Sequence, residues 1–142
     1  MKMIQLTNGS IGAIAIDAYI PMGTITRRID CSPNAATFVT GNSTADTITI
    51  TDEGYYNITY SLTAVADAAG VANTSLVING TPVYTVGTTT TAGGTYTITL
   101  PYVVRVFRRC DNMATNNPMT VQVTTDAAIT SGTSNIIVEK IY

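Results

Sequence analysis

The sequence of 142 residues contains no histidine. Histidine is the usual general base near neutral pH, the commonest zinc ligand, and the partner of serine or cysteine in nucleophilic sites. A catalyst without it needs carboxylate pairs, lysines or a cofactor. The acids of this chain are scattered, and adjacent Asp52 and Glu53 would point to opposite faces of a strand. We therefore expect no enzymatic activity and no cofactor, with a carboxylate-using hydrolase as the rival hypothesis.

Charged residues are also scarce. They make up 11% of the chain and leave a net charge of −2, where about 25% is typical. A pI near 4.7 and the lack of a long basic run argue against nucleic acid as a partner. So little charge opposes self-association only weakly, which favours an oligomer.

Cysteine is limited to Cys31 and Cys110, which are compatible with one disulfide or with two free thiols and lack the C-x-x-C spacing of a redox or zinc site. The apolar stretch IGAIAIDAYIP near the start is short and broken by Asp17. It fits neither a signal peptide nor a membrane span, so we expect synthesis in a cytoplasm, no membrane partner, and free thiols.

A period-two pattern dominates the chain from residue 36 onward. In EGYYNITYSL, residues 53–62, one face of a strand receives the apolar side chains Tyr56, Ile58, Tyr60 and Leu62. The other face receives Tyr55, Asn57, Thr59 and Ser61. That apolar face must be covered, either by a second sheet of the same chain or by a neighbouring copy.

Further strand patterns follow, separated by turn signals. Asn79-Gly80 predicts a tight hairpin turn after SLVI, and TVGTTTTAGG is typical of a polar loop. Other segments are rich in β-branched residues, namely TITIT, TYTITL, YVVRVF, MTVQVTT and NIIVEKIY. The prediction is an all-β sandwich or barrel of about eight strands that spans residues 36–142.

Residues 1–35 differ in kind: they contain Gly12, Gly23, Pro21 and Pro33, and the segment IGAIAI alternates isoleucines with alanines. They predict an N-terminal arm or an added strand, the alternative being the first strand of the same sheet.

The last strand pattern, IIVEKI, has apolar residues on both faces. Ile136 and Val138 share one face, whereas Ile137 and Ile141 share the other. A two-layer sandwich covers only its inner faces, so the outer face of this strand favours contact with a second subunit.

These features resemble the jelly roll of tumour necrosis factor and the complement globular head, above all the compact versions in phage virions and bacterial surface proteins. The residues that carry the resemblance over 36–142 are Gly54, Tyr56 and Ile58 in a Gly-x-Tyr-x-aromatic strand entry, and Leu76, Ile78, Asn79 and Gly80 in a strand ending in NG. The Gly-Asp pair common before a late strand is replaced by Cys110-Asp111. The resemblance implies a homotrimer that buries Tyr56, Ile58, Tyr60, Ile137 and Ile141 between subunits.

The family's role implies assembly or recognition rather than catalysis. We expect a phage structural protein located in the virion, such as a capsid decoration or head-fibre protein that contacts the major capsid protein or another virion protein. The alternative is a receptor- or glycan-binding tip module.

Three arginines, Arg105, Arg108 and Arg109, could bind acidic groups of such a partner, or be a solvated strand end. Asp67 could ligate a metal but is more typical of a loop carboxylate bonded to nearby backbone, and no metal site is predicted.

Overall fold

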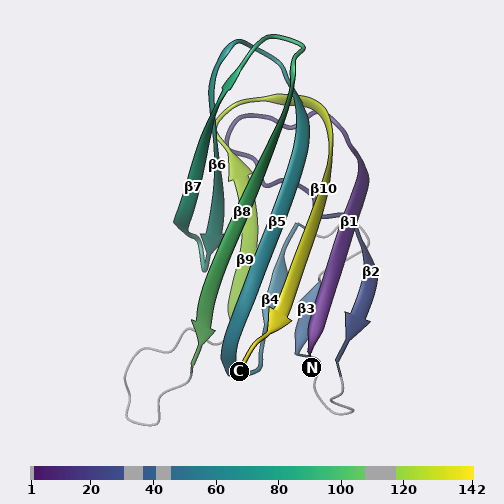
Figure 1. Ribbon diagram of the computed structural model, residues 1–142, viewed down its shortest axis with the longest axis vertical. Coiled ribbons are helices and arrows are strands. Elements are labelled where there is room, and N and C mark those ends of the chain that lie inside the picture. The colour runs from purple at the N-terminus through teal and green to yellow at the C-terminus, as the bar shows by residue number, and fades with distance from the viewer. Residues whose placement is uncertain (1, 31–36, 41–45, 108–117) are drawn as a thin grey trace.

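The computed structural model describes residues 2–30, 37–40, 46–107 and 118–142. Ten strands form two five-stranded sheets that face each other (Figure 1). Sheet A has the order β2-β1-β10-β5-β8, with bounds β2 Thr24–Ile29, β1 Met3–Ile11, β10 Ile129–Lys140, β5 Gly54–Ala66 and β8 Thr95–Val106. Sheet B has the order β3-β4-β9-β6-β7, with bounds β3 Phe38–Thr40, β4 Ile48–Ile50, β9 Met119–Thr125, β6 Gly70–Ile78 and β7 Thr81–Thr90.

Neighbouring strands are antiparallel throughout, and the arrangement is a jelly-roll sandwich. The all-β prediction is confirmed: eight strands, β3 to β10, lie in the described part of residues 36–142, where about eight were expected, and β1 and β2 precede them. No helix in this part of the chain is long and apolar enough to cross a membrane.

The core lies between the sheets and is built by alternation. On β5 every second side chain is buried, and Tyr56, Ile58, Tyr60 and Leu62 are all 0% exposed. Phe38 of sheet B packs edge-on against Tyr56, with ring centroids 6.0 Å apart. The second sheet of the same chain therefore covers the apolar face of residues 53–62.

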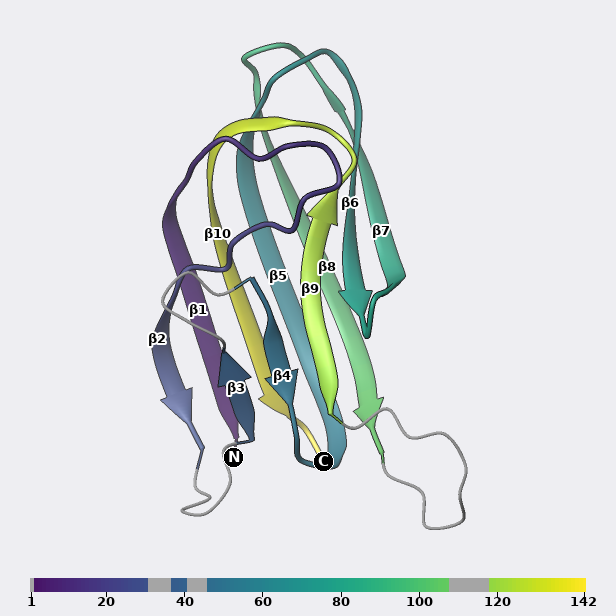
Figure 2. The same cartoon turned by 180° about the vertical axis from the view of Figure 1, so that it is seen from behind.

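The N-terminal segment is part of this sandwich. Strand β1 lies inside sheet A between β2 and β10, with Met3 paired to Glu139, and its Ile4 and Leu6 are 0% exposed. The chain between β1 and β2 then crosses to sheet B (Figure 2), where the Ile20 amide donates to the Val123 carbonyl at 2.8 Å. The arm hypothesis for residues 1–35 is therefore wrong for the described residues 2–30, because their apolar side chains complete the core.

The predicted hairpin turn at Asn79-Gly80 is confirmed. Both residues have positive φ, 49° and 80°, and they connect β6 to β7. The predicted polar loop over TVGTTTTAGG is wrong in its first half, because β7 continues to Thr90. Tyr84 of β7 and Tyr102 of β8 pack with ring centroids 6.3 Å apart, so these edge strands of the two sheets contact each other.

Candidate subunit interface

The outer face of sheet A carries very little charge. Across β1, β10, β5 and β8 the outward side chains are Met3, Gln5, Thr7, Ser131, Thr133, Asn135, Ile137, Glu139, Tyr55, Asn57, Thr59, Ser61, Thr63, Val65, Thr95, Thr97, Thr99, Pro101, Val103 and Arg105. Glu139 and Arg105 are the charged members of this set. The face is otherwise hydroxyls and amides with an apolar end.

Hydrogen bonds between strands hold the polar part of this face. Gln5 Nε2 donates to Asn135 Oδ1 at 2.8 Å, and Asn57 Nδ2 donates to Glu139 Oε1 at 3.3 Å. These side chains are half-buried within one copy. Because these bonds already order the side chains, another surface can cover the polar part with little loss of conformational freedom.

The apolar end is a contiguous exposed patch, which we call the tyrosine patch: Tyr55, Val103, Ile141 and Tyr142. These side chains are 43%, 57%, 55% and 88% exposed, respectively. They line one shallow hollow of about 360 Å³. The rings of Tyr55 and Tyr142 meet edge-to-face, with centroids 6.3 Å apart. A patch of two aromatic and two aliphatic side chains on one sheet end is typical of an interaction site.

Backbone bonds to the start of β5 position the patch. The Ile141 amide donates to the Tyr55 carbonyl at 2.8 Å, and the Tyr55 amide donates to the Tyr142 carbonyl at 3.2 Å. This close approach requires Gly54, because a Cβ there would lie 2.5 Å from both the Tyr142 carbonyl oxygen and Lys140 Cε. Gly54 also has φ of 146°, which L side chains rarely adopt.

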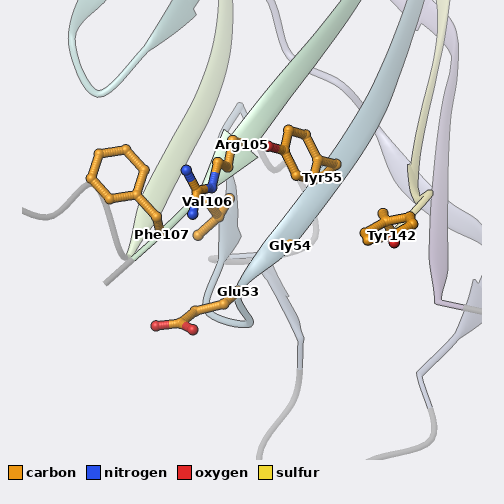
Figure 3. Close-up of a pocket in the computed structure, with 7 residues that line it drawn as sticks. All are labelled: Glu53, Gly54, Tyr55, Arg105, Val106, Phe107 and Tyr142. Atoms are coloured by element: carbon orange, nitrogen blue, oxygen red, sulfur yellow. The ribbon is translucent and has the colours of Figure 1, made fainter. Parts of the chain in front are cut away.

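Arg105 adjoins the tyrosine patch and is flanked by two aromatic rings. Its guanidinium carbon lies 5.8 Å from the centre of the Tyr55 ring and 5.5 Å from that of Phe107. Figure 3 shows the guanidinium between these rings in a cleft of about 240 Å³ that Glu53 and Tyr142 also line. Aromatic faces attract and orient a guanidinium, so Arg105 is presented outward in a defined direction.

An ion-pair cluster lies next to the patch and joins three segments. Asp52 Oδ2 accepts from Lys2 Nζ at 2.9 Å and from Lys140 Nζ at 2.8 Å. The hydrogen bond from Lys140, and then that from Lys2, lower the pKa of the Asp52 carboxyl against the effect of burial. The cluster fixes the start of β1 and the end of β10 to the turn before β5.

Three of the predicted interface residues need correction. Tyr56, Ile58 and Tyr60 point inward and are fully buried within one copy, so no neighbouring subunit can contact their side chains. Burial raises the pKa of the Tyr56 and Tyr60 hydroxyls. The error lay in the choice of face, since the aromatic face of β5 is the core face.

The other predicted residues lie elsewhere. Ile137 is outward and half-buried in the middle of the outer face of sheet A, and Ile141 belongs to the tyrosine patch. Arg105 is beside that patch, whereas Arg108 and Arg109, with Cys31 and Cys110, are outside the described residues. In the described part of the chain, no group of three or more acid or cysteine side chains could hold a metal ion.

Sequence inspection missed Tyr55, Val103 and Tyr142. The alternation in YVVRVF did contain a signal for Val103, because Val104 and Val106 belong to the core face and Val103 and Arg105 must then face outward. The alternation correctly places Tyr55 on the face opposite Tyr56, but the other residues of that face, Asn57, Thr59 and Ser61, are polar and do not indicate an apolar patch. For Tyr142 there was no local signal, because its position depends on pairing with β5.

Searches by structure found the same fold in proteins of very different sequence. The globular domain of zebrafish complement 1qA superposes with a TM-score of 0.66 at 10% identity, covering 100% of this chain and 98% of that one. Eiger TNF from S. frugiperda gives a TM-score of 0.69 at 8% identity, covering 99% of this chain and 92% of the other. The PRD1 vertex protein P5 gives 0.60 at 15% identity, covering 99% and 97%.

These likenesses confirm the predicted tumour necrosis factor-like jelly roll at the level of the fold. No protein-family model matches the chain, and no curated protein matches it by sequence.

Proposed function

We propose that this protein is a non-enzymatic virion structural protein that assembles as a homotrimer through the outer face of sheet A. The observation that carries the proposal is the tyrosine patch at the end of an almost uncharged sheet face. Within the virion its role would be capsid decoration or a head fibre.

The apolar side chains of sheet A are contiguous, which distinguishes this face from the outer face of sheet B. On sheet B the exposed valines are apart: Val39 is on β3, at the edge opposite β7. Val71 is paired with Thr89 of β7, far along the ladder from Val83, which adjoins the Leu76–Tyr84 pair. Single exposed apolar side chains are ordinary on a protein surface, whereas a clustered patch favours contact with another molecule. A second copy suits the face because it has little charge to repel an identical surface.

The resemblance to tumour necrosis factor and complement globular heads implies that the assembly is a trimer rather than a dimer. A three-fold axis along the length of sheet A would bring the outer faces of three copies together. The tyrosine patches would then form the apolar end of the contact, and Ile137 would lie nearer its middle.

The virion role is supported by the likeness to the PRD1 vertex protein P5, which extends over nearly the whole of both chains. The same fold occurs in complement and tumour necrosis factor proteins, so the fold alone does not select a virion. The composition adds weight against catalysis, because the chain has no histidine and Asp52 is already paired with two lysines.

The interface is tested by a matched pair of valine substitutions. Val103→Asp places a carboxylate in the tyrosine patch, whereas Val71→Asp places one on the outer face of sheet B at nearly equal exposure, 57% against 59%. Burying an unpaired carboxylate costs on the order of several kcal/mol. We expect wild type and Val71→Asp to be trimers by light scattering and Val103→Asp to be a folded monomer.

A wild-type protein that is monomeric at micromolar concentration would contradict the proposal. So would a Val103→Asp variant that stays trimeric, because the interface would then lie on another surface. Circular dichroism of each variant separates loss of assembly from loss of folding.

A glycan-binding tip is the second candidate, and the cleft lined by Tyr55, Phe107, Arg105 and Tyr142 is the observation that favours it. Aromatic rings beside polar groups are suited to stacking on sugars. The two candidates make opposite demands on the cleft, because a trimer built on sheet A covers it. A stable monomer would favour the glycan-binding candidate.

A further inference from the structure

Glu139 is the one acid on the outer face of β1, β10, β5 and β8 in the described residues. Its side chain is half-buried, and one carboxylate oxygen accepts from Asn57 Nδ2 at 3.3 Å. No cation of the described residues forms an ion pair with it. A carboxylate in this position is tolerated while water reaches it, and it becomes costly once a neighbouring subunit excludes that water.

We propose that Arg105 of one subunit pairs with Glu139 of the next, and that this pair sets the register of the trimer. The inference rests on the proposed function, since it assumes the contact through sheet A. Each subunit would give its arginine to one neighbour and its glutamate to the other, as a head-to-tail cyclic contact requires.

Arg105 and Glu139 lie at nearly the same position along the strand direction of sheet A. Glu139 is paired with Asn57, Asn57 with Val103, and Arg105 follows two residues after Val103 on β8. Two residues of strand amount to about 7 Å, which the long arginine side chain can span. A three-fold axis along the sheet keeps residues at similar positions along this direction together, so rotation carries the β8 side of one copy towards β10 of another.

Arg105 is better placed for this role than Arg27, the other arginine that faces outward from sheet A. Arg105 adjoins the tyrosine patch, where apolar contact would exclude water, and the rings of Tyr55 and Phe107 orient its guanidinium. Arg27 lies on the opposite edge strand, β2, and is exposed. Desolvation strengthens an ion pair only where apolar surface surrounds it, and this favours the Arg105 side.

Charge reversal tests the pair. The variants are Arg105→Glu, Glu139→Arg and the double variant, with Arg27→Glu as the matched control, and the measurement is the trimer dissociation constant from light scattering over a dilution series. We expect each single variant to weaken the trimer by about tenfold or more and the double variant to recover to within about threefold of wild type. Arg27→Glu should stay within about threefold of wild type.

A double variant no better than the weaker single variant would overturn the pairing, as would single variants with no effect. If Arg27→Glu dissociates the trimer and Arg105→Glu does not, the inference has named the wrong arginine. In all three cases the wild type remains a trimer and the proposed function stands. A monomeric wild type would overturn both.

Discussion

At the scale of single residues, two aspartates tie strands together in different surroundings. The Asp30 side chain is 4% exposed; its Oδ2 accepts from the Thr37 amide at 2.6 Å and from Arg28 at 3.3 Å. Burial opposes its ionisation, but these bonds outweigh burial and lower the pKa of the Asp30 carboxyl. Asp52 is 35% exposed and pairs with Lys2 and Lys140. Solvent screens the ion pairs of Asp52 more than that of Asp30, so each contact of Asp52 contributes less to the free energy of unfolding.

Asp52 predicts a pH dependence of stability. Its pKa in the folded protein lies below the ordinary value of 3.8, chiefly because of the hydrogen bond from Lys140. A lowered folded-state pKa adds stability above the unfolded pKa, and this contribution is lost as the pH falls through the folded pKa. Asp52→Asn should therefore lower the free energy of unfolding at pH 7, by less than about 1 kcal/mol after solvent screening.

The measurement is urea unfolding of wild type and Asp52→Asn at pH 7 and at about pH 2. The difference should be present at pH 7 and should shrink at the lower pH, because it is lost as the pH falls through the folded-state pKa of Asp52. Asp46→Asn is the control, since Asp46 is an exposed carboxylate that accepts from Thr47 Oγ1. A difference that persists unchanged at low pH would mean that Asp52 acts through its shape rather than its charge.

At the scale of elements, the N-terminal strand tests how the sandwich is closed. Removing residues 1–29 would take away β1 and β2 and expose one side of β10. It would also remove six buried apolar side chains, Met3, Ile4, Leu6, Ile11, Ile20 and Met22. We expect no cooperative thermal unfolding of this truncated chain by circular dichroism, because the remaining sheets cannot exclude water from the core.

Single substitutions in β1 and β2 test the same contribution to stability in smaller steps. Leu6→Ala should lower the free energy of unfolding by about 2–5 kcal/mol, as is typical of a fully buried leucine. Thr26→Ala on the exposed strand β2 should change it by less than about 0.5 kcal/mol. A truncated chain that still unfolds cooperatively would show that residues 1–29 are an addition to an independent sandwich.

The strands could be predicted from the sequence where alternation is regular, as in β5 and β9. The position of β1 could not, because it depends on pairing Met3 with Glu139 at the other end of the chain. Strand β7 was taken for a loop over residues 85–90 because its threonines and Gly87 give no apolar alternation. It lies at the edge of sheet B, where most of its side chains are exposed and polar residues are tolerated.

The candidate interface could be predicted only in part for a related reason. The two-faced pattern of the last strand located Ile137 and Ile141 on the outer side of sheet A. Period two alone cannot say which face of β5 is the core face, since Tyr55 and Tyr56 are both aromatic. The tyrosine patch also combines residues of β5, of β8 and of the segment after β10, and their proximity follows from register, which the sequence does not state.

At the scale of the whole molecule, the two chain termini and the tyrosine patch lie at one end of the sandwich (Figure 1). The β1–β2 connection, with exposed Ile16 and Tyr19, lies towards the other end (Figure 2). Because residues 2–30 are built into the fold, they are not available as a separate anchor. Any attachment of this protein to a particle would therefore use other surface groups.

The proposed virion role requires attachment to a particle, and of the three predicted arginines Arg108 and Arg109 remain for it, since the proposed ion pair uses Arg105. Guanidinium groups bind carboxylates of a partner through paired hydrogen bonds, and three subunits would supply six such groups. We expect the trimer with both arginines changed to serine to stay folded and trimeric and to lose co-sedimentation with undecorated particles. Arg27→Ser is the control and should co-sediment like wild type.

Because exposed ion pairs are screened by salt, wild-type binding should also weaken as ionic strength rises. Binding that persists in the double variant, or that is insensitive to salt, would place the attachment surface on uncharged groups elsewhere on the trimer.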